Sequence, residues 1–394
     1  MKTYEYKGFT VDGKVNRGLV EASTVKEARE KLASQGVLAE RIQTTGRRLR
    51  FPVAIRAVVY RELSALLRAG VPLSRALEIL IDSPHTRSAR ALLAGVRDRV
   101  REGVSLADAI SEASQSVADY EQSVLVAGEA SATIADVLER LADYLEEQDR
   151  LKERIRSALI YPSIVVALGL CVAGVMLGVL VPRARELLVE SGQPLPVLTQ
   201  WTIGFANGFY AWGPVLILVI ILAAFVCRVQ VKRNDRFRIR LDQFRFAWPL
   251  WGRGYVLLVC MRFSRTLAVL LQGGVSLLES VRLAGKATGS SWVSAMVDAQ
   301  ADAVRHGARL SQAIATIPPL ADTLPGWVQI GEESGNVAGM MEHAGARYEE
   351  RWERFLSRAL VLLEPLLMLL IGAFVLIITL SLLLPIIAIT KSVG

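Results

Sequence analysis

Residues 66–80 read LLRAGVPLSRALEIL, and residues 270–284 read LLQGGVSLLESVRLA, which is the same pattern 204 positions later. The offset stays at 204 from Leu66 to Ile110 and is 203 from Gly128 onward, because one position is lost between them. Each copy leads into an apolar run of membrane length. Agreement over so long a stretch indicates that one unit was duplicated in tandem.

Two short motifs recur in both copies, Leu-Leu-x-x-Gly-Val-x-Leu and Gly-Glu-x-Ser, and each copy carries a proline where its apolar run begins. We take these motifs as structural or interaction sites. The residues selected are Gly70, Pro72, Gly128, Glu129, Ser131 and Pro162 in the first copy, and Gly274, Gly331, Glu332, Ser334, Gly335, Glu364 and Pro365 in the second.

The composition predicts a protein that is partly embedded in a membrane. The chain is 52% hydrophobic with a mean hydropathy of +0.36, yet 21% of its 394 residues are charged. About 20 helical residues cross the roughly 30 Å hydrocarbon core of a bilayer. Three transmembrane helices are therefore predicted, at 159–181, 205–227 and 360–390.

The charges that flank these spans predict their orientation. Basic residues are abundant before the first span, after the second and before the third, and they are few on the opposite side. Because Lys and Arg are retained in the cytoplasm, we expect a cytoplasmic N-terminus, a periplasmic loop at 182–204 and a periplasmic C-terminus. Both copies then lie on one side of the membrane, and the second span returns the chain between them.

Three polar regions complete the domain organisation. Residues 1–45 alternate as strands around the turn signal Asp12-Gly13 and then read as a helix, so a small α/β module is expected. Residues 53–158 and 228–359 have helical periodicity, which predicts two homologous cytoplasmic bundles in a mainly α membrane protein. In the module, Val25, Ala28 and Leu32 are expected to fall on one face of the helix.

Three features of the sequence occur together: the Leu-Leu-x-x-Gly-Val-x-Leu signature at 66–73 and 270–277, the two Gly-Glu-x-Ser motifs, and Tyr161-Pro162 and Glu364-Pro365 before the apolar runs. In this combination, with the small module and three spans, nearly the whole chain resembles the F-type inner-membrane protein of type II secretion systems and its type IV pilus counterpart. One departure is Ala132, which stands where the family pattern prefers glycine and where a positive φ would strain the turn.

The resemblance implies an assembly platform in the bacterial inner membrane. Its implied partners are a hexameric cytoplasmic ATPase, pilin or pseudopilin subunits, other inner-membrane assembly proteins and further copies of the chain itself. The basic segment from Arg228 to Arg245 is expected to contact anionic lipid headgroups, and no nucleic acid is needed to explain the net charge of +8.

Two roles stay open for Glu129 and Glu332. Each carboxylate stands where one helix is expected to end and the next to begin, so it can accept backbone N–H groups at the following helix N-terminus. Alternatively, each makes a charged contact with the ATPase or a neighbouring subunit. Gly174 and Gly178 form a small-xxx-small pair in the first span and are candidates for close helix packing.

Enzyme chemistry is not expected. The Gly-Lys pair at Gly285-Lys286 lacks the remaining residues of a phosphate-binding loop, and the three histidines have no metal-ligand spacing. No cofactor is therefore predicted. A membrane transporter or channel subunit is the alternative function, but transport sites place ionisable groups in mid-membrane, whereas Glu364 is expected at the membrane interface.

Overall fold

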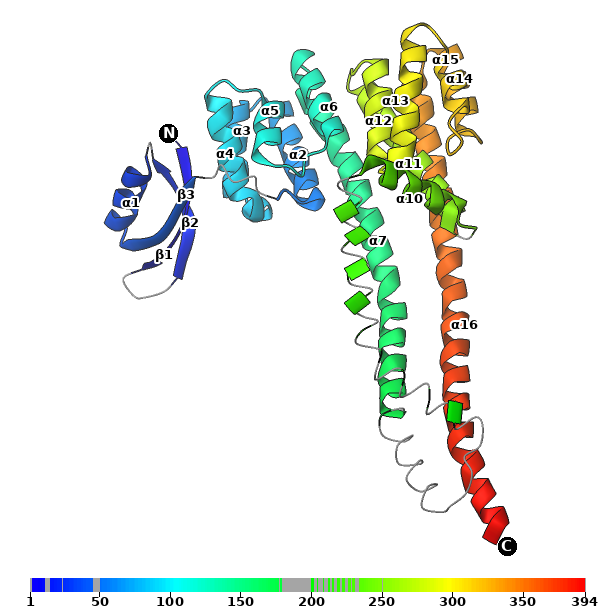
Figure 1. The fold of residues 1–394 in the computed structure, drawn as a ribbon. Helices are drawn as coiled ribbons and strands as arrows, with labels where there is room; N and C mark the ends of the chain where they lie inside the picture. Colours follow the sequence, from blue (N-terminus) through cyan, green and yellow to red (C-terminus); the bar gives the residue numbers. More distant parts are fainter. Residues whose placement is uncertain are drawn as a thin grey trace. The chain divides into compact units, whose positions relative to one another are not determined.

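The computed structural model describes residues 2–10, 15–22, 24–44, 50–176, 178, 234–249 and 251–393, with isolated positions between 200 and 230. Two compact units divide the chain: residues 1–152 with 245–350, and residues 153–244 with 351–394. The mainly helical fold, the small sheet and the duplicated domains are as predicted (Figure 1).

The N-terminal module is an antiparallel sheet of order β2-β1-β3 with one helix. Its elements are β1 (Lys2–Thr10), β2 (Val15–Ala22), α1 (Val25–Ser34) and β3 (Val37–Thr44). Tyr4 and Tyr6 of β1 pack in one core with Ala28 and Leu32 of α1. Of the three residues expected on one face of α1, Ala28 and Leu32 are buried, whereas the Val25 side chain in the first turn is 44% exposed. The expected turn at Asp12-Gly13 lies outside the described residues.

The first helical domain has six α-helices and a short 3-10 helix. They are α2 (Val53–Arg68), α3 (Leu73–Asp82), η1 (Pro84–Ala89), α4 (Arg90–Arg101), α5 (Leu106–Ala113), α6 (Asp119–Ala130) and α7 (Ile134–Val175). Apolar side chains at helical spacing meet in one core, in which Tyr60, Leu63 and Leu138 are fully buried.

The second helical domain repeats this order of helices. After α10 (Asp235–Ala247) come α11 (Trp251–Gln272), α12 (Leu277–Ala287), α13 (Ser291–Arg305), α14 (Leu310–Ala315), α15 (Leu324–Ser334) and α16 (Val337–Val393). With the sequence offset, α11 to α16 correspond to α2 to α7. Phe263, Leu267 and Val328 are buried in its core.

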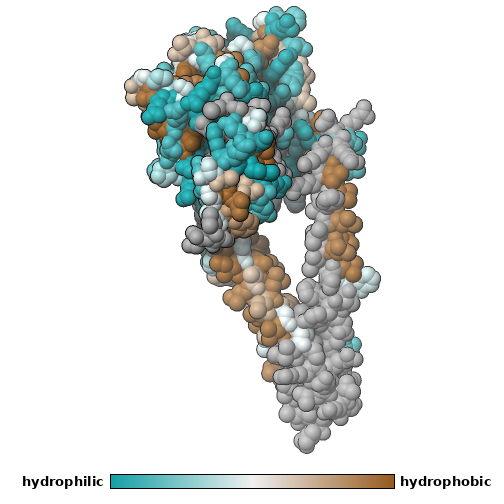
Figure 2. Space-filling model, turned by 90° about the vertical axis from the view of Figure 1, so that its left-hand side faces the viewer, coloured by the Kyte–Doolittle hydropathy of each residue, from teal (hydrophilic) through white to brown (hydrophobic). Residues whose placement is uncertain are grey.

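Three described helices are long and apolar enough to cross a membrane, and they are α7, α11 and α16. The apolar stretches of α7 and α16 are almost fully exposed, whereas most of that of α11 is buried in the second domain, so we assign α11 to the protein core. Brown, hydrophobic side chains mark the described apolar stretches in Figure 2, while the part of the chain above them that faces the viewer is mostly teal. The predicted loop at 182–204 and span at 205–227 fall largely outside the described residues.

The membrane-side unit contains polar contacts near the predicted start of the spans. Arg154 and Glu353 form an ion pair, and the Tyr161 hydroxyl donates to Glu364 Oε1 at 3.3 Å. Pro162 lies inside α7, and Pro365 lies inside α16. α7 and α16 therefore each continue as one helix past these prolines.

The two helical domains contribute side chains to a common apolar core. Val269, Leu270 and Val275 of the second domain are buried in the cluster formed by the first domain. At the same contact, a Cβ added to Gly273 would lie 3.0 Å from Val124 Cγ1 of α6, so only a small residue allows this approach. The domains thus pack as a protein interior does, and not as two separately hydrated surfaces.

Polar contacts fix the register of this packing. The hydroxyls of Tyr144 on α7 and Thr266 on α11 are 2.7 Å apart and buried. Nearby, Arg265 Nη2 lies 3.3 Å from Glu147 of the first domain. Buried hydroxyls need such partners, because an unpaired one costs about 1–3 kcal/mol.

Candidate functional site: the Gly-Glu-x-Ser corners

Glu129 is in the last turn of α6, and its carboxylate caps a different helix. Oε1 accepts the backbone N–H of Leu106 at 2.6 Å, and Oε2 accepts that of Ala107 at 3.3 Å. These two N–H groups open α5, where the helix dipole favours a negative charge. From the sequence, the carboxylate was expected to cap the following helix, α7. The structure places the carboxylate at the start of the preceding helix instead.

Glu332 makes the same contact in the second domain. Its Oε1 accepts the N–H of Leu310 at 2.6 Å, and its Oε2 accepts the Ser311 hydroxyl at 2.6 Å and the Ser311 N–H at 3.4 Å. The capped helix is α14, the counterpart of α5. The duplicated glutamate thus has a duplicated structural role.

The glycine before each glutamate allows two helices to meet closely. A Cβ at Gly128 would lie 2.8 Å from Val137 Cγ2, and a Cβ at Gly331 would lie 2.8 Å from Val337 Cα. Real Cβ contacts are essentially never that short. A larger residue at either position would separate the last two helices of the domain and move the carboxylate beside it.

The turn after the motif is left-handed in both domains. Gly335 has φ of +69°, and Ala132 at the corresponding place has φ of +57°. Glycine adopts this conformation freely, whereas an L side chain there costs about 1–2 kcal/mol. The turn at Ala132 therefore has the positive φ at which backbone strain was expected for this alanine.

The motif serines close the ends of their helices. The Ser131 hydroxyl donates to Ala127 O at 2.8 Å and lies 2.7 Å from the Thr133 hydroxyl. The Ser334 hydroxyl lies 3.4 Å from Gly331 O. Both serines therefore bond locally, within the corner itself.

The Leu-Leu-x-x-Gly-Val-x-Leu signature ends one helix and starts the next. Gly70 and Gly274 have φ of +80° and +83°, and in each case the next residue donates its N–H back to the first leucine of the signature at 3.0 Å. Pro72 is the N-cap of α3, and Ser276, the N-cap of α12, accepts the Glu279 N–H at 3.4 Å. The signature therefore has a structural role, which is to form the turn between two consecutive helices.

The selected residues do not form a single site. The Gly-Glu-x-Ser corners, the helix-ending glycines and Pro72 lie in the two domains of one unit, whereas Pro162, Glu364 and Pro365 belong to the membrane-side unit. Gly174 is exposed on α7, where an added Cβ would meet open space, and Gly178 is also exposed. Close packing at these two glycines stays a prediction.

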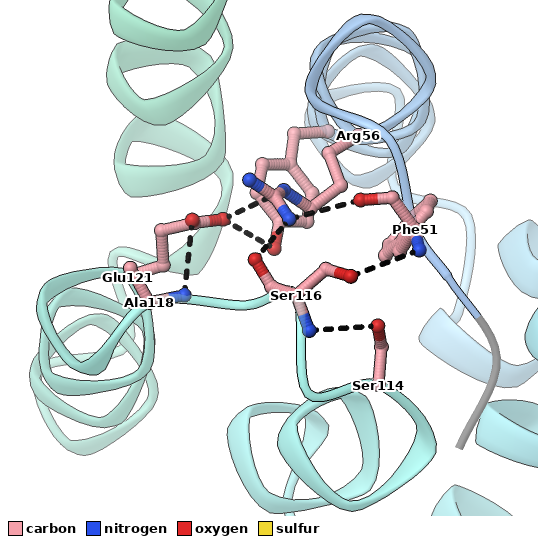
Figure 3. A network of polar contacts seen from close by, with 7 residues as sticks. Phe51, Arg56, Ser114, Ser116, Ala118 and Glu121 are labelled. Carbon is pink, nitrogen blue, oxygen red and sulfur yellow. Dashed lines mark hydrogen bonds and ion pairs between the residues drawn. The ribbon is translucent and has the colours of Figure 1, made fainter. Parts of the chain in front are cut away.

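A buried polar network in the first domain was missed by the sequence analysis (Figure 3). Arg56 and Glu121 form an ion pair at 3.2 Å, with side chains 5% and 0% exposed. Tyr60 donates its hydroxyl to Glu121 at 3.3 Å, and Arg56 also donates to Phe51 O at 2.9 Å and to Ser116 O. The network joins the start of α2 to the start of α6.

Burial determines the electrostatics of this network. Desolvation raises the pKa of the Glu121 carboxyl, and the nearby Arg56 guanidinium opposes the increase. Desolvation also raises the pKa of the Tyr60 hydroxyl well above its ordinary value. Removing one member of a buried pair leaves an uncompensated charge, which typically costs about 3–5 kcal/mol.

The second domain has no such charges at the corresponding positions. The repeat offsets pair Arg56 with Cys260 and Glu121 with Leu324. Both of these residues are buried, and the Cys260 thiol lies 3.3 Å from Pro319 O. This difference between the copies was the available sequence signal, because an apolar residue in one copy suggests that its charged counterpart is also buried.

Two family models match the chain. The one described as "Type II secretion system (T2SS), protein F" matches residues 59–182 and again residues 263–385, once in each copy. The one described as "Type II secretion system protein F, N-terminal domain" matches residues 1–43. Together they cover the module and both duplicated units.

Full-length relatives agree with the family models. The chain is 29% identical over 413 aligned positions to the type II secretion system protein F of Pseudomonas aeruginosa, covering 100% of both chains. It is 31% identical over 379 positions to the type 4 fimbrial assembly protein PilC of Pseudomonas putida, covering 95% of this chain and 94% of that one. It is 29% identical over 390 positions to the type IV pilus assembly protein PilC of Thermus thermophilus, covering 95% of each.

The fold and the repeated corners define a multi-pass membrane protein with two homologous helical domains and a small N-terminal α/β module. The matches then give the family: the chain belongs to the type II secretion system protein F family. The relatives named above are secretion and pilus assembly proteins, which supports the platform interpretation and does not support the transporter alternative.

Proposed function

We propose that this chain is the inner-membrane platform on which a type IV pilus or a type II secretion pseudopilus is assembled. It couples a hexameric cytoplasmic ATPase to the extraction and polymerisation of pilin or pseudopilin subunits, it acts as a homo-oligomer beside other inner-membrane assembly proteins, and it performs no catalysis itself. The family and the pilus and secretion roles in the names of its relatives support this assignment.

The observation that carries the mechanism is helix continuity. α7 runs without interruption from the first helical core into an exposed apolar stretch, and α16 does the same from the second. A rigid helix transmits a displacement along its length, so work done on the cytoplasmic bundles reaches the bilayer through these two helices. The domain contact that buries Leu270 makes both bundles respond together.

The orientation is part of the proposal. The N-terminus and both helical domains are cytoplasmic, where an ATPase can reach them, and the C-terminus is periplasmic. The domain limits are 1–45, 53–158 and 228–359, with spans at 159–181, 205–227 and 360–390 and a periplasmic loop at 182–204. The imbalance of flanking basic residues supports this arrangement.

Gene deletion with complementation tests the function. Deletion in the bacterium that makes this chain is expected to abolish surface filaments or secretion through the system, and the wild-type gene is expected to restore them. Photo-crosslinkers on exposed positions of the helical domains are expected to capture the ATPase. Undiminished filament or secretion output in the deletion strain would contradict the proposal.

A further inference from the structure

The contact between the two helical domains uses different faces of two homologous folds. The first domain contributes α6 and α7, and the second contributes α11 and α12. Since α11 and α12 correspond to α2 and α3, the contact is head-to-tail. The counterpart faces, α2/α3 of the first domain and α15/α16 of the second, are not used by this contact.

The α2/α3 face of the first domain carries apolar side chains that are exposed. Ile79 of α3 is 40% exposed, whereas its counterpart Leu283 is 8% exposed within the domain contact. Ala69 is exposed, and its counterpart Gly273 is buried against α6, where an added Cβ would lie 3.0 Å from Val124 Cγ1. A second copy must therefore pack slightly farther from α2 at Ala69 than α6 does from Gly273, while Ile79 is free to be covered.

The counterpart face on the second domain is also apolar and open. Ile330 of α15 is 54% exposed, and Trp327 is half-buried where its counterpart Val124 is 0% exposed. Large exposed apolar side chains that cluster on one face mark interaction surfaces more often than scattered ones do. A matching pair of faces therefore remains at the two ends of the domain tandem.

The ion pairs at the domain contact can be compared with those on the α2/α3 face of the first domain. Arg265 Nη2 binds Glu349 of its own domain at 2.9 Å and Glu147 of the other domain at 3.3 Å. Its counterpart Arg61 binds Glu146, the counterpart of Glu349, at 3.1 Å. Arg61 also binds Asp143 of its own domain, which takes the place of the second carboxylate that Glu147 gives to Arg265.

The second domain also carries a carboxylate at the position that corresponds to Glu147. The repeat offset pairs Glu147 with Glu350, which is exposed on α16, so a second copy would bring Glu350 to Arg61. The hydroxyl pair at the internal contact is replaced by Arg347 and Glu62, which are also complementary. Within α16, Arg347 binds Glu350 at 3.0 Å, so the two charges would exchange this exposed pair for partners in the second copy. One pairing opposes the contact, because the counterparts of Asp119 and Lys286 are both aspartates. Such exposed charges contribute about 0–1 kcal/mol each.

We propose that a second copy of this chain binds head-to-tail through these faces, so that α15/α16 of one copy packs on α2/α3 of the next and repeats the contact found inside the chain. The occupant follows from the internal contact, since the chain already contains both halves of the interface. Anchoring of both domains to one membrane favours closure into a ring about the membrane normal. This inference specifies the homo-oligomer of the proposed function.

Cysteine cross-linking tests the geometry in the full-length chain. Within the chain, Ser123 Oγ lies 3.5 Å from Glu279 Oε1, and the counterparts of these residues are Gly326 and Arg75, both exposed. Two differently tagged chains, one with R75C and one with G326C, are co-expressed in a background without native cysteines and treated in membranes with a short bis-maleimide. We expect a cross-linked dimer that contains both tags.

Two controls make every outcome informative. Ser123→Cys with Glu279→Cys in one chain should cross-link internally, which verifies the contact that serves as the template. Glu112→Cys on α5, which takes no part in the domain contact described above, replaces R75C as the negative pair. Failure of R75C and G326C to link while the internal pair links, or equal linking with the negative pair, would overturn the proposal.

A substitution series gives an independent reading. Ile79→Asp and Ile330→Asp should each lower the oligomeric mass of the purified protein in detergent, whereas Val25→Asp, at a side chain 44% exposed in the N-terminal module, should not. An unchanged mass for both test variants would contradict the proposed faces. Complementation of the deletion strain by the wild-type gene stays a separate measurement, so failure of this interface is distinguishable from failure of the platform function.

Discussion

Replacing Glu332 by alanine should destabilise the start of α14 locally. The carboxylate accepts the Leu310 N–H at 2.6 Å and the Ser311 hydroxyl at 2.6 Å, and it is half-buried. Hydrogen bonds to a charged group contribute about 1.5–3 kcal/mol, and loss of a helix cap costs about 0.5–2 kcal/mol. Because water can replace part of the contact at a half-buried site, we expect a net loss of about 2 kcal/mol.

Hydrogen exchange measures this loss where it occurs. A change of about 2 kcal/mol in local opening corresponds to about 30-fold faster exchange, since about 1.4 kcal/mol is tenfold. Mass spectrometry of the full-length protein in detergent should show this acceleration in the peptide that contains Leu310 and Ser311. Glu333→Ala is the matched control, because Glu333 is exposed and binds Gln329 on the surface at 2.9 Å; it should change exchange less than threefold, as surface pairs contribute little.

The same experiment separates the two roles considered for the motif. If Glu332→Ala left exchange at 310–315 unchanged and still abolished filament or secretion output, the carboxylate would act on a partner, and the capping account would be wrong. The corresponding change at Glu129 should accelerate exchange at the start of α5 by a similar factor.

Three further predictions follow from individual residues. Ala132→Gly should raise the free energy of unfolding by about 1 kcal/mol and Gly335→Ala should lower it by at least as much, measured by denaturant titration, because both turns are left-handed. Glu121→Leu should lower the free energy of unfolding by about 3–5 kcal/mol, and adding Arg56→Met should restore at least about 2 kcal/mol of this loss. Because the pKa of Glu121 is raised in the folded protein, the stability of the wild type should fall as pH rises from the ordinary carboxyl range through that pKa, and the double variant should not show this pH dependence. Burial raises the pKa of the Cys260 thiol to about 12, so iodoacetamide at pH 8 should modify it only after unfolding, as read by mass spectrometry.

Most of the structural features that could be predicted from the sequence came from its internal repeat. A constant offset predicts paired helices without any structural knowledge, and glycines such as Gly70 and Gly274 could be placed at helix ends because the left-handed conformation there favours glycine. Ala132 was singled out because the family pattern prefers glycine there, and its φ of +57° agrees with that preference. A backbone conformation can be predicted from the sequence when the residues that determine it lie within a few positions.

Contacts between distant segments were not readable in the same way. Glu129 was expected at the next helix, but the N–H groups it accepts lie 22 and 23 positions earlier, and nothing in the local pattern points there. Arg56 and Glu121 lie 65 positions apart in sequence, and only the fold brings them together in the core. The domain contact was missed because homologous domains bury opposite faces, so the repeat itself gives no reason to choose either.

The central claim is that both helical domains lie on the cytoplasmic face and act as one body. Single cysteines at exposed positions of each domain, Glu102→Cys and Asp302→Cys, can be placed in a background without native cysteines and treated with a membrane-impermeant maleimide. Both should be labelled in inverted inner-membrane vesicles and protected in right-side-out vesicles. Labelling of either cysteine in right-side-out vesicles with the other protected would place the domains on opposite faces and contradict the account.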